Sequence, residues 1–171
     1  RSRFGIEIIK AARAAVGPDY PIILRWSQWK QQDYTARLVD SPEQLEAFIQ
    51  PLSDAGVDIF HCSQRRFWEP EFDGSDLNLA GWVRKITGKP AITVGSVGLN
   101  ADFIPEPGQR TFREAEPASL EELLGRMDAN EFDLVAVGRA LIANPSWVDM
   151  VQAERLDELK PFRKEHLGEL I

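Results

Sequence analysis

Residues 132–147, FDLVAVGRALIANPSW, contain the turn that decides the fold. An apolar run ends at Gly138 and is followed at once by Arg139, so the pattern predicts a strand that ends in a glycine turn. Residues 90–98, PAITVGSVG, repeat this form, with Gly95 and Ser96 after the apolar run. Glycine lets backbone N–H groups approach an anion, and arginine is a permanently charged, two-pronged partner for phosphate. The two turns therefore predict a phosphate-binding site.

Strand and helix patterns alternate along the rest of the chain. Apolar, β-rich runs predict four strands, at residues 21–27, 57–63, 90–98 and 132–138. Amphipathic patterns predict helices at 1–17, 41–56, 76–89, 119–131 and 144–156. One helix followed by four strand–helix units is the rhythm of a parallel α/β structure.

Capping residues mark several helix starts. Ser41 and Asn144 each precede a proline, as N-cap residues often do, and Ser119 with Glu122 has the spacing of a capping box. In the first helix, the residues expected to form one apolar stripe are Phe4, Ile8, Ala11, Ala12 and Ala15.

Long loops follow the first three strands, at 28–40, 64–75 and 98–117, whereas the returns from helix to strand are short. These loops would rim one edge of the sheet, where α/β proteins bind ligands. Four strand–helix units make half of an eight-fold barrel, and the last two loops of such a barrel commonly hold phosphate. We therefore expect residues 1–171 to be the C-terminal half of a (β/α)₈ TIM barrel, without its N-terminal half. A complete, open doubly wound sheet is the alternative.

Composition narrows the class of protein. The chain is 43% hydrophobic and 27% charged, with a net charge of −7, which argues against a nucleic-acid surface. No apolar run is long enough to span a bilayer, and residues 1–17 do not resemble a signal peptide. The single cysteine, Cys62, excludes an internal disulfide and fits a reducing cytosol, and no histidine or cysteine cluster has metal-ligand spacing. We expect a cytoplasmic enzyme with no metal, membrane or nucleic-acid partner.

Several stretches in order, 1–17 with 21–27, then 90–98, then DLVAVGRALIANPSWV at 133–148, resemble the Old Yellow Enzyme family of FMN-dependent ene-reductases. That family folds as a (β/α)₈ barrel with FMN at the carboxyl ends of the strands. The resemblance implies that this chain supplies strands five to eight.

The resemblance also implies cofactor-binding residues. Arg25 matches the arginine beside the pyrimidine edge of the flavin, where it would stabilise the negative charge of the reduced form. Gly95 and Ser96, with Val97 beside them, match the turn that receives the FMN phosphate. Gly138 and Arg139 match the second phosphate element.

The activity implied is transfer of hydride from NADH or NADPH, through flavin N5, to an electron-poor alkene such as an α,β-unsaturated carbonyl. The complete protein is expected to be a homo-oligomer that acts on a small enone-like molecule. In this family the histidine pair that holds the substrate and the proton-donating tyrosine lie in the first half of the barrel. We therefore expect no catalytic residue in this chain, and no activity from it alone.

Other residues have weaker assignments. We expect His61 to be structural and Cys62 to be a buried, unreactive thiol. Phe67 and Trp68, in the loop after the second strand, are candidates for a substrate pocket, with packing of the loop on the rim as the alternative.

Two other functions remain open at this stage. One is a phosphate-binding TIM-barrel isomerase or aldolase, which would normally need a lysine or carboxylate at a strand end. The other is a non-catalytic half-barrel that serves as a binding module.

Overall fold

A computed structural model describes residues 2–30, 32–103 and 113–168 of the chain. Its sheet contains β1 (Ile23–Ser27), β2 (Ile59–Ser63), β3 (Ala91–Val94) and β4 (Leu134–Ala136), all parallel and in the order β1-β2-β3-β4. The helices are α1 (Arg3–Val16), α2 (Pro42–Asp54), α3 (Leu79–Thr87), α4 (Glu121–Asp128), α5 (Arg139–Ala143) and α6 (Trp147–Gln152), followed by the 3₁₀ turns η1 (Leu156–Glu158) and η2 (Lys164–Leu167). The predicted α/β fold with a parallel sheet is confirmed.

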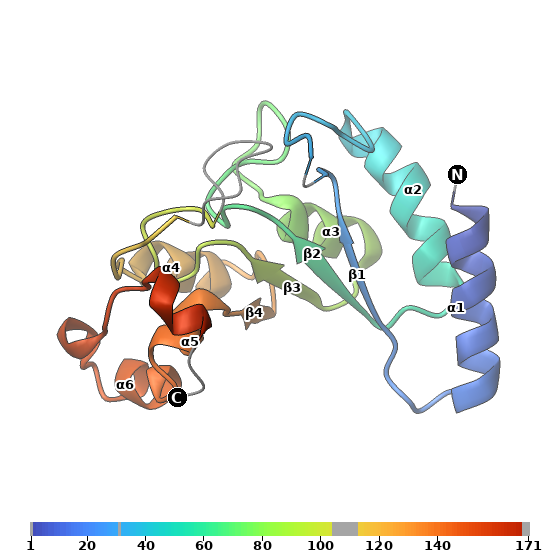
Figure 1. The fold of residues 1–171 in the computed structure, drawn as a ribbon. Helices are drawn as coiled ribbons and strands as arrows, with labels where there is room; N and C mark the ends of the chain where they lie inside the picture. Colours follow the sequence, from blue (N-terminus) through green and yellow to red (C-terminus); the bar gives the residue numbers. More distant parts are fainter. Residues whose placement is uncertain (1, 31, 104–112, 169–171) are drawn as a thin grey trace.

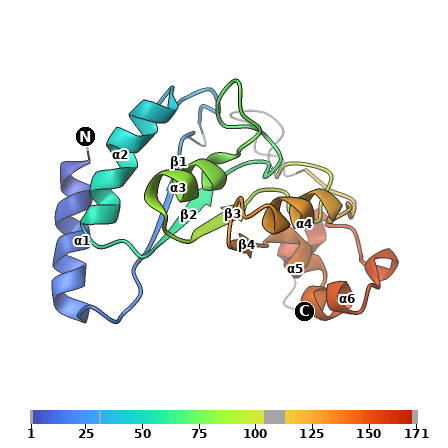
Figure 2. The same cartoon turned by 180° about the vertical axis from the view of Figure 1, so that it is seen from behind.

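Helices cover one face of the sheet. Helices α3 and α4 lie behind the strands in Figure 1 and in front of them in Figure 2. Helix α2 lies beside β1, where Phe48 meets Trp26 with a ring-centre distance of 5.3 Å. Phe60, Cys62 and Ala91 point to this covered face and are fully buried. On the opposite face Ile23 is 53% exposed and Leu134 is 48% exposed. An apolar sheet face is thus left uncovered within the described part of the chain.

The helix that follows β2 shows how local sequence sets the geometry. Asn78 caps α3 by accepting a hydrogen bond from the Gly81 N–H at 2.9 Å, and Gly88 ends the helix in the left-handed conformation. Ser41 caps α2 in the same way, with the Gln44 N–H as donor. The latter cap was predicted, and the structure confirms it.

The predicted apolar stripe of α1 is mostly exposed, since of its five residues only Ala12 is partly buried. Phe4 is 74% exposed and Ile8 is 52% exposed, whereas Ile9 is buried. The helix is turned so that the guanidinium of Arg13 faces inward, where it forms an ion pair with Asp58 just before β2. The inward side of the helix thus carries this ion pair together with Ile9.

Two predicted caps are also wrong. Helix α4 begins at Glu121, so the Ser119 hydroxyl accepts from the Glu121 N–H at 3.1 Å and no capping box forms. Helix α6 begins only at Trp147, and the Asn144 side chain binds a distant backbone instead of capping it. The separate short helix α5 was not predicted. The centre of the predicted loop 98–117 lies outside the described residues.

Two kinds of feature are absent from the described residues. They contain no helix that is long and apolar enough to cross a bilayer. They also contain no group of three or more histidine, cysteine, aspartate or glutamate side chains placed to hold a metal ion.

Candidate functional site

A hollow of about 440 Å³ opens at the carboxyl ends of the strands. The six residues predicted to bind the cofactor all line it: Arg25, Gly95, Ser96, Val97, Gly138 and Arg139. They come from β1, from the turn after β3 and from the turn after β4, which are separated by up to 114 residues of chain (25 to 139). The parallel sheet therefore brings these positions to a single site.

The turn after β3 requires glycine at its first position. Gly95 has a φ of +129°, and a Cβ atom there would lie 2.8 Å from backbone atoms of Gln64, Arg65 and Arg66. The next residue, Ser96, has a φ of +52°, and its hydroxyl lies 3.1 Å from the Arg65 carbonyl oxygen. The turn thus packs directly against the loop after β2, and there is no room for a side chain at position 95.

Arg139 is held on several sides but keeps one nitrogen without a partner. Its Nη2 donates to the Ala101 carbonyl at 2.6 Å and lies 3.4 Å from the Ser96 hydroxyl. Its guanidinium carbon lies 5.7 Å from the ring centre of Phe103 and 5.6 Å from that of Phe162. Nη1 is buried and has no hydrogen-bond partner among the residues described.

Burial also affects the charge of Arg139. Desolvation lowers the pKa of its guanidinium, and nearby Asp102 opposes that shift. Arginine stays protonated in proteins even so. A half-buried cation with an unused donor is suited to an anion that enters the hollow.

Arg25 and His61 are register partners on the uncovered face of the sheet. Burial lowers the pKa of His61, and the positive charge of Arg25 lowers it further. The His61 Nε2 is buried without a partner in the described part of the chain. Cys62 points to the opposite, covered face, where burial raises the pKa of its thiol well above the usual range, as predicted for an unreactive residue.

Phe67 and Trp68 do not lie in the hollow that contains Arg25 and Arg139. Phe67 is buried and meets Trp68 edge to face at 5.1 Å, and both line a separate hollow on the outer side of the turn after β3. A backbone hydrogen bond holds Phe67 at this place, because its N–H donates to the Gly95 carbonyl at 3.1 Å and so fixes the loop against the turn after β3. The two rings therefore lie beside the Gly95–Ser96 turn, and Ser96 lines both hollows, but the rings do not line the hollow that contains Arg25 and Arg139.

Several residues that line the hollow were not assigned to it from the sequence, among them Trp29, Tyr34 and Arg65. The Arg65 guanidinium carbon lies 3.8 Å from the ring centre of Tyr34, and the Tyr34 ring meets Trp29 edge to face at 5.3 Å. These contacts join the loops 28–40 and 64–75. The loops were predicted to rim the site, but pairing between two loops has no signal in either one alone.

Buried Asp102 joins the same region to the turn after β3. It accepts from Arg65 Nη2 at 2.6 Å and from Arg66 Nε at 2.6 Å. The described lining of the hollow contains three arginines, Arg25, Arg65 and Arg139, and no acidic residue. The hollow is therefore electropositive in a chain whose net charge is −7.

Fold and site together define an α/β protein with an arginine-lined hollow at the carboxyl edge of a parallel sheet. Known proteins to which the chain is similar narrow this class. NADH oxidase from Thermoanaerobacter brockii is 31% identical over 168 residues, a match that covers 94% of this chain and 22% of that protein. No protein-family model matches the chain.

Solved structures agree with that match. Morphinone reductase in complex with tetrahydroNAD aligns with a TM-score of 0.62 and 19% identity, over 96% of this chain and 37% of its own. The Old Yellow Enzyme homologue from Zymomonas mobilis aligns with a TM-score of 0.61 and 18% identity, over 96% of this chain and 39% of its own. At this identity the two structures show a shared fold.

The chain is thus similar, over nearly its whole length, to one part of Old Yellow Enzyme-type proteins, and the resemblance predicted from the sequence is confirmed. It spans well under half the length of each of these proteins.

Proposed function

We propose that the chain is the C-terminal half of a (β/α)₈ TIM barrel and supplies strands five to eight of an FMN-dependent oxidoreductase. The complete enzyme would pass hydride from NADH or NADPH to an electron-poor alkene such as an α,β-unsaturated carbonyl. The main support is the electropositive hollow, in which all six predicted residues meet and Arg139 keeps a buried donor unused. The uncovered, apolar face of the sheet also supports this proposal, since closure of a barrel would bury it.

The residues of the hollow fit FMN. The Gly95–Val97 turn and Arg139 would hold the phosphate, because they combine close backbone approach with a charge-assisted hydrogen bond from Nη1. Arg25 lines the opposite side of the hollow, on β1, and would hold a fixed positive charge beside the isoalloxazine ring. When bound, FMN supplies the two-electron chemistry. The protein contributes binding, orientation and the charge of Arg25.

A sugar-phosphate isomerase or aldolase is less well supported. Such enzymes need a lysine or carboxylate near the phosphate site for proton transfer or imine formation. The described lining of the hollow contains neither.

Absorbance and bound-cofactor analysis of the full-length protein test the proposal. We expect a flavin spectrum and release of FMN on denaturation, followed by bleaching of the bound flavin when NADH or NADPH is added without oxygen. A colourless protein that does not take up added FMN would refute the proposed function.

A further inference from the structure

We propose that Asn144, which does not line the hollow, is a positioning residue for its phosphate-binding arginine. Asn144 anchors residues 160–167, which we name the C-terminal strap, and the strap in turn holds the Arg139 guanidinium. This inference rests on the proposed function, because it assigns to Asn144 a part in binding the FMN phosphate.

Asn144 is buried, and its side-chain amide bonds to backbone groups on two segments. Its Oδ1 accepts from the Lys160 N–H at 2.8 Å, and its Nδ2 donates to the Lys160 carbonyl at 3.0 Å. Nδ2 also lies 3.1 Å from the carbonyl of Ala140, the residue after Arg139. One side chain thus pairs with both backbone groups of a residue 16 positions away and ties that residue to the first turn of α5. No aliphatic side chain can replace these bonds.

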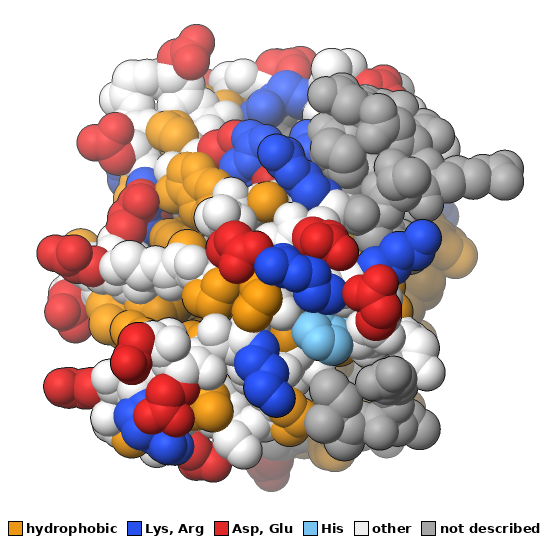
Figure 3. Space-filling model, turned by 60° about the vertical axis from the view of Figure 1, so that its left-hand side comes forward, with side chains coloured by type: hydrophobic (Ala, Val, Ile, Leu, Met, Phe, Trp, Pro, Cys, Tyr) orange, Lys and Arg blue, Asp and Glu red, His pale blue; other side chains and the backbone are white. Residues whose placement is uncertain are grey.

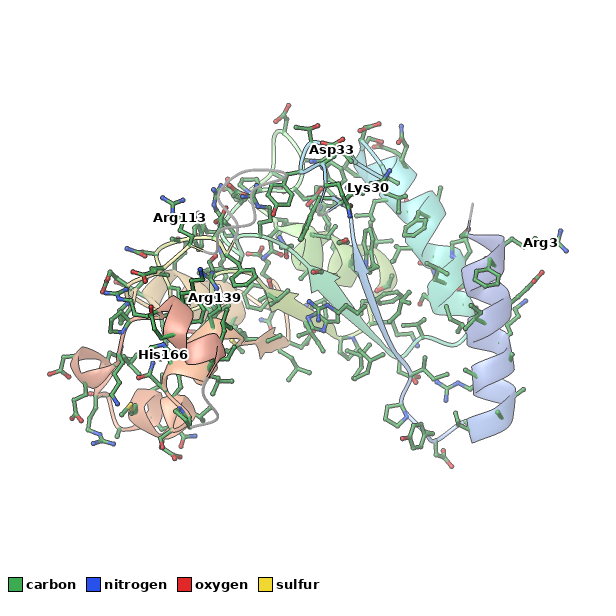
Figure 4. All side chains as sticks on the ribbon, viewed as in Figure 1. Arg3, Lys30, Asp33, Arg113, Arg139 and His166 are labelled. Carbon is green, nitrogen blue, oxygen red and sulfur yellow. The ribbon has the colours of Figure 1, made fainter. Side chains whose placement is uncertain are left out.

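The strap continues from Lys160 to the ring that contacts Arg139. Phe162 is fully buried, and its backbone pairs with Ala115 in an antiparallel bridge, with hydrogen bonds of 2.8 and 3.1 Å. Its ring lies 5.6 Å from the guanidinium carbon of Arg139 and 6.4 Å from the ring of Phe103. At the far end of the strap, Leu167 lines the hollow itself. Figure 4 shows Arg139 near the C-terminal segment that carries His166.

Surface contacts alone would hold the strap weakly. Arg163 pairs with Glu116 at 2.6 Å, but both side chains are substantially exposed, and exposed pairs contribute little. Charged side chains of both signs lie on the face shown in Figure 3. The buried amide of Asn144 is therefore the stronger anchor for the start of the strap.

Holding the guanidinium matters because, among the described residues, hydrogen bonds fix only its Nη2 nitrogen. Its two hydrogen-bond acceptors, Ala101 and Ser96, both bind Nη2 and leave the buried Nη1 without a partner among the described residues. The rings of Phe103 and Phe162 limit how the guanidinium plane can turn, so Nη1 is already oriented before the anion arrives. Release of the strap would give Arg139 freedom that must be lost again on binding. The effect should therefore appear in the affinity for the phosphate group.

The test compares FMN with riboflavin, which lacks the phosphate, in the full-length protein. Asn144→Ala should raise the Kd for FMN about tenfold and leave the Kd for riboflavin unchanged, in line with coupling between neighbouring groups. In an Arg139→Ala background, Asn144→Ala should have almost no further effect on FMN, because its influence passes through Arg139. Gln50→Ala is the matched control, since it removes an amide on α2 that donates to Asp54 at 2.8 Å, far from the strap.

A second variant protects the test against misfolding of the first. Phe162→Leu keeps the strap apolar but removes the ring, and it should weaken FMN selectively as well. Equal losses of FMN and riboflavin, independent effects of Asn144 and Arg139, or no change in FMN affinity in either variant would each overturn the inference. A wild-type protein that binds neither flavin refutes the proposed function, and the inference with it.

Discussion

Replacement of Gly95 by alanine should be costly, and replacement of Gly138 should not, although the two glycines occupy similar places in the sequence. Gly95 has a φ of +129°, which side chains rarely adopt, and its added Cβ would lie 2.8 Å from three backbone atoms of the loop after β2. Gly138 has a φ of −114°, and an added Cβ there would meet nothing within 4 Å.

The expected magnitudes follow from these two environments. An unfavourable φ costs about 1–3 kcal/mol, and overpacking against backbone that cannot move aside costs about 1–3 kcal/mol more. Gly95→Ala should therefore lower the free energy of unfolding by roughly 2–6 kcal/mol. Gly138→Ala should change it by at most about 1 kcal/mol, since glycine-to-alanine changes are small where the backbone conformation is tolerated.

Urea unfolding of the full-length protein and the two variants measures both values, provided that the slope of each transition is unchanged. Flavin content after dialysis, measured on the same samples, should fall for Gly95→Ala because the turn that faces the hollow is displaced. Equal costs for the two substitutions, or a cost below about 1 kcal/mol for Gly95→Ala, would refute the argument from φ and contact distance.

Three further substitutions test individual side chains. Arg139→Ala should weaken FMN retention by about 1.5–3 kcal/mol through loss of a charge-assisted hydrogen bond, and unchanged flavin content after dialysis would contradict the assignment. Arg25→Met should make the two-electron reduction potential of the bound flavin more negative, because the reduced form loses a nearby positive charge, and a potentiometric titration with no shift would show that Arg25 is structural. Burial and Arg25 lower the pKa of His61 in the folded protein, so as the pH falls the unfolded chain binds this proton before the folded protein does. The contribution of neutral His61 to the free energy of unfolding should therefore be fully present above the ordinary histidine pKa of about 6.5 and decrease as the pH drops below it. Urea midpoints at several pH values should show a smaller fall for His61→Gln than for the wild type, and identical pH profiles would exclude this contribution.

The strands and the phosphate turn could be predicted because their signals are local. Each apolar run became a strand, and Gly95 and Arg139 met because parallel strands place their carboxyl ends at one edge. The cap at Ser41 was also predictable, since the capping bond spans only three residues.

The errors arose where a distant partner decided the outcome. The apolar stripe through Phe4 and Ile8 is exposed, whereas Arg13 faces inward and pairs with Asp58, which lies 45 residues away in the sequence. Asn144 has an ideal N-cap sequence, but its side-chain amide hydrogen-bonds to the backbone of Lys160 and caps no helix. No local pattern contains such information.

The order of the sheet, in which each strand lies beside its neighbour in sequence, has a consequence for synthesis on the ribosome. As soon as β2 and then β3 emerge, the partner of each is already present, and none of the three pairings has to wait for a segment translated much later. During elongation the last strand to emerge keeps an unpaired edge until the next strand arrives. Short sequence separation between partners favours rapid closure of the intervening chain, so each new unit can be added to a surface that is already folded.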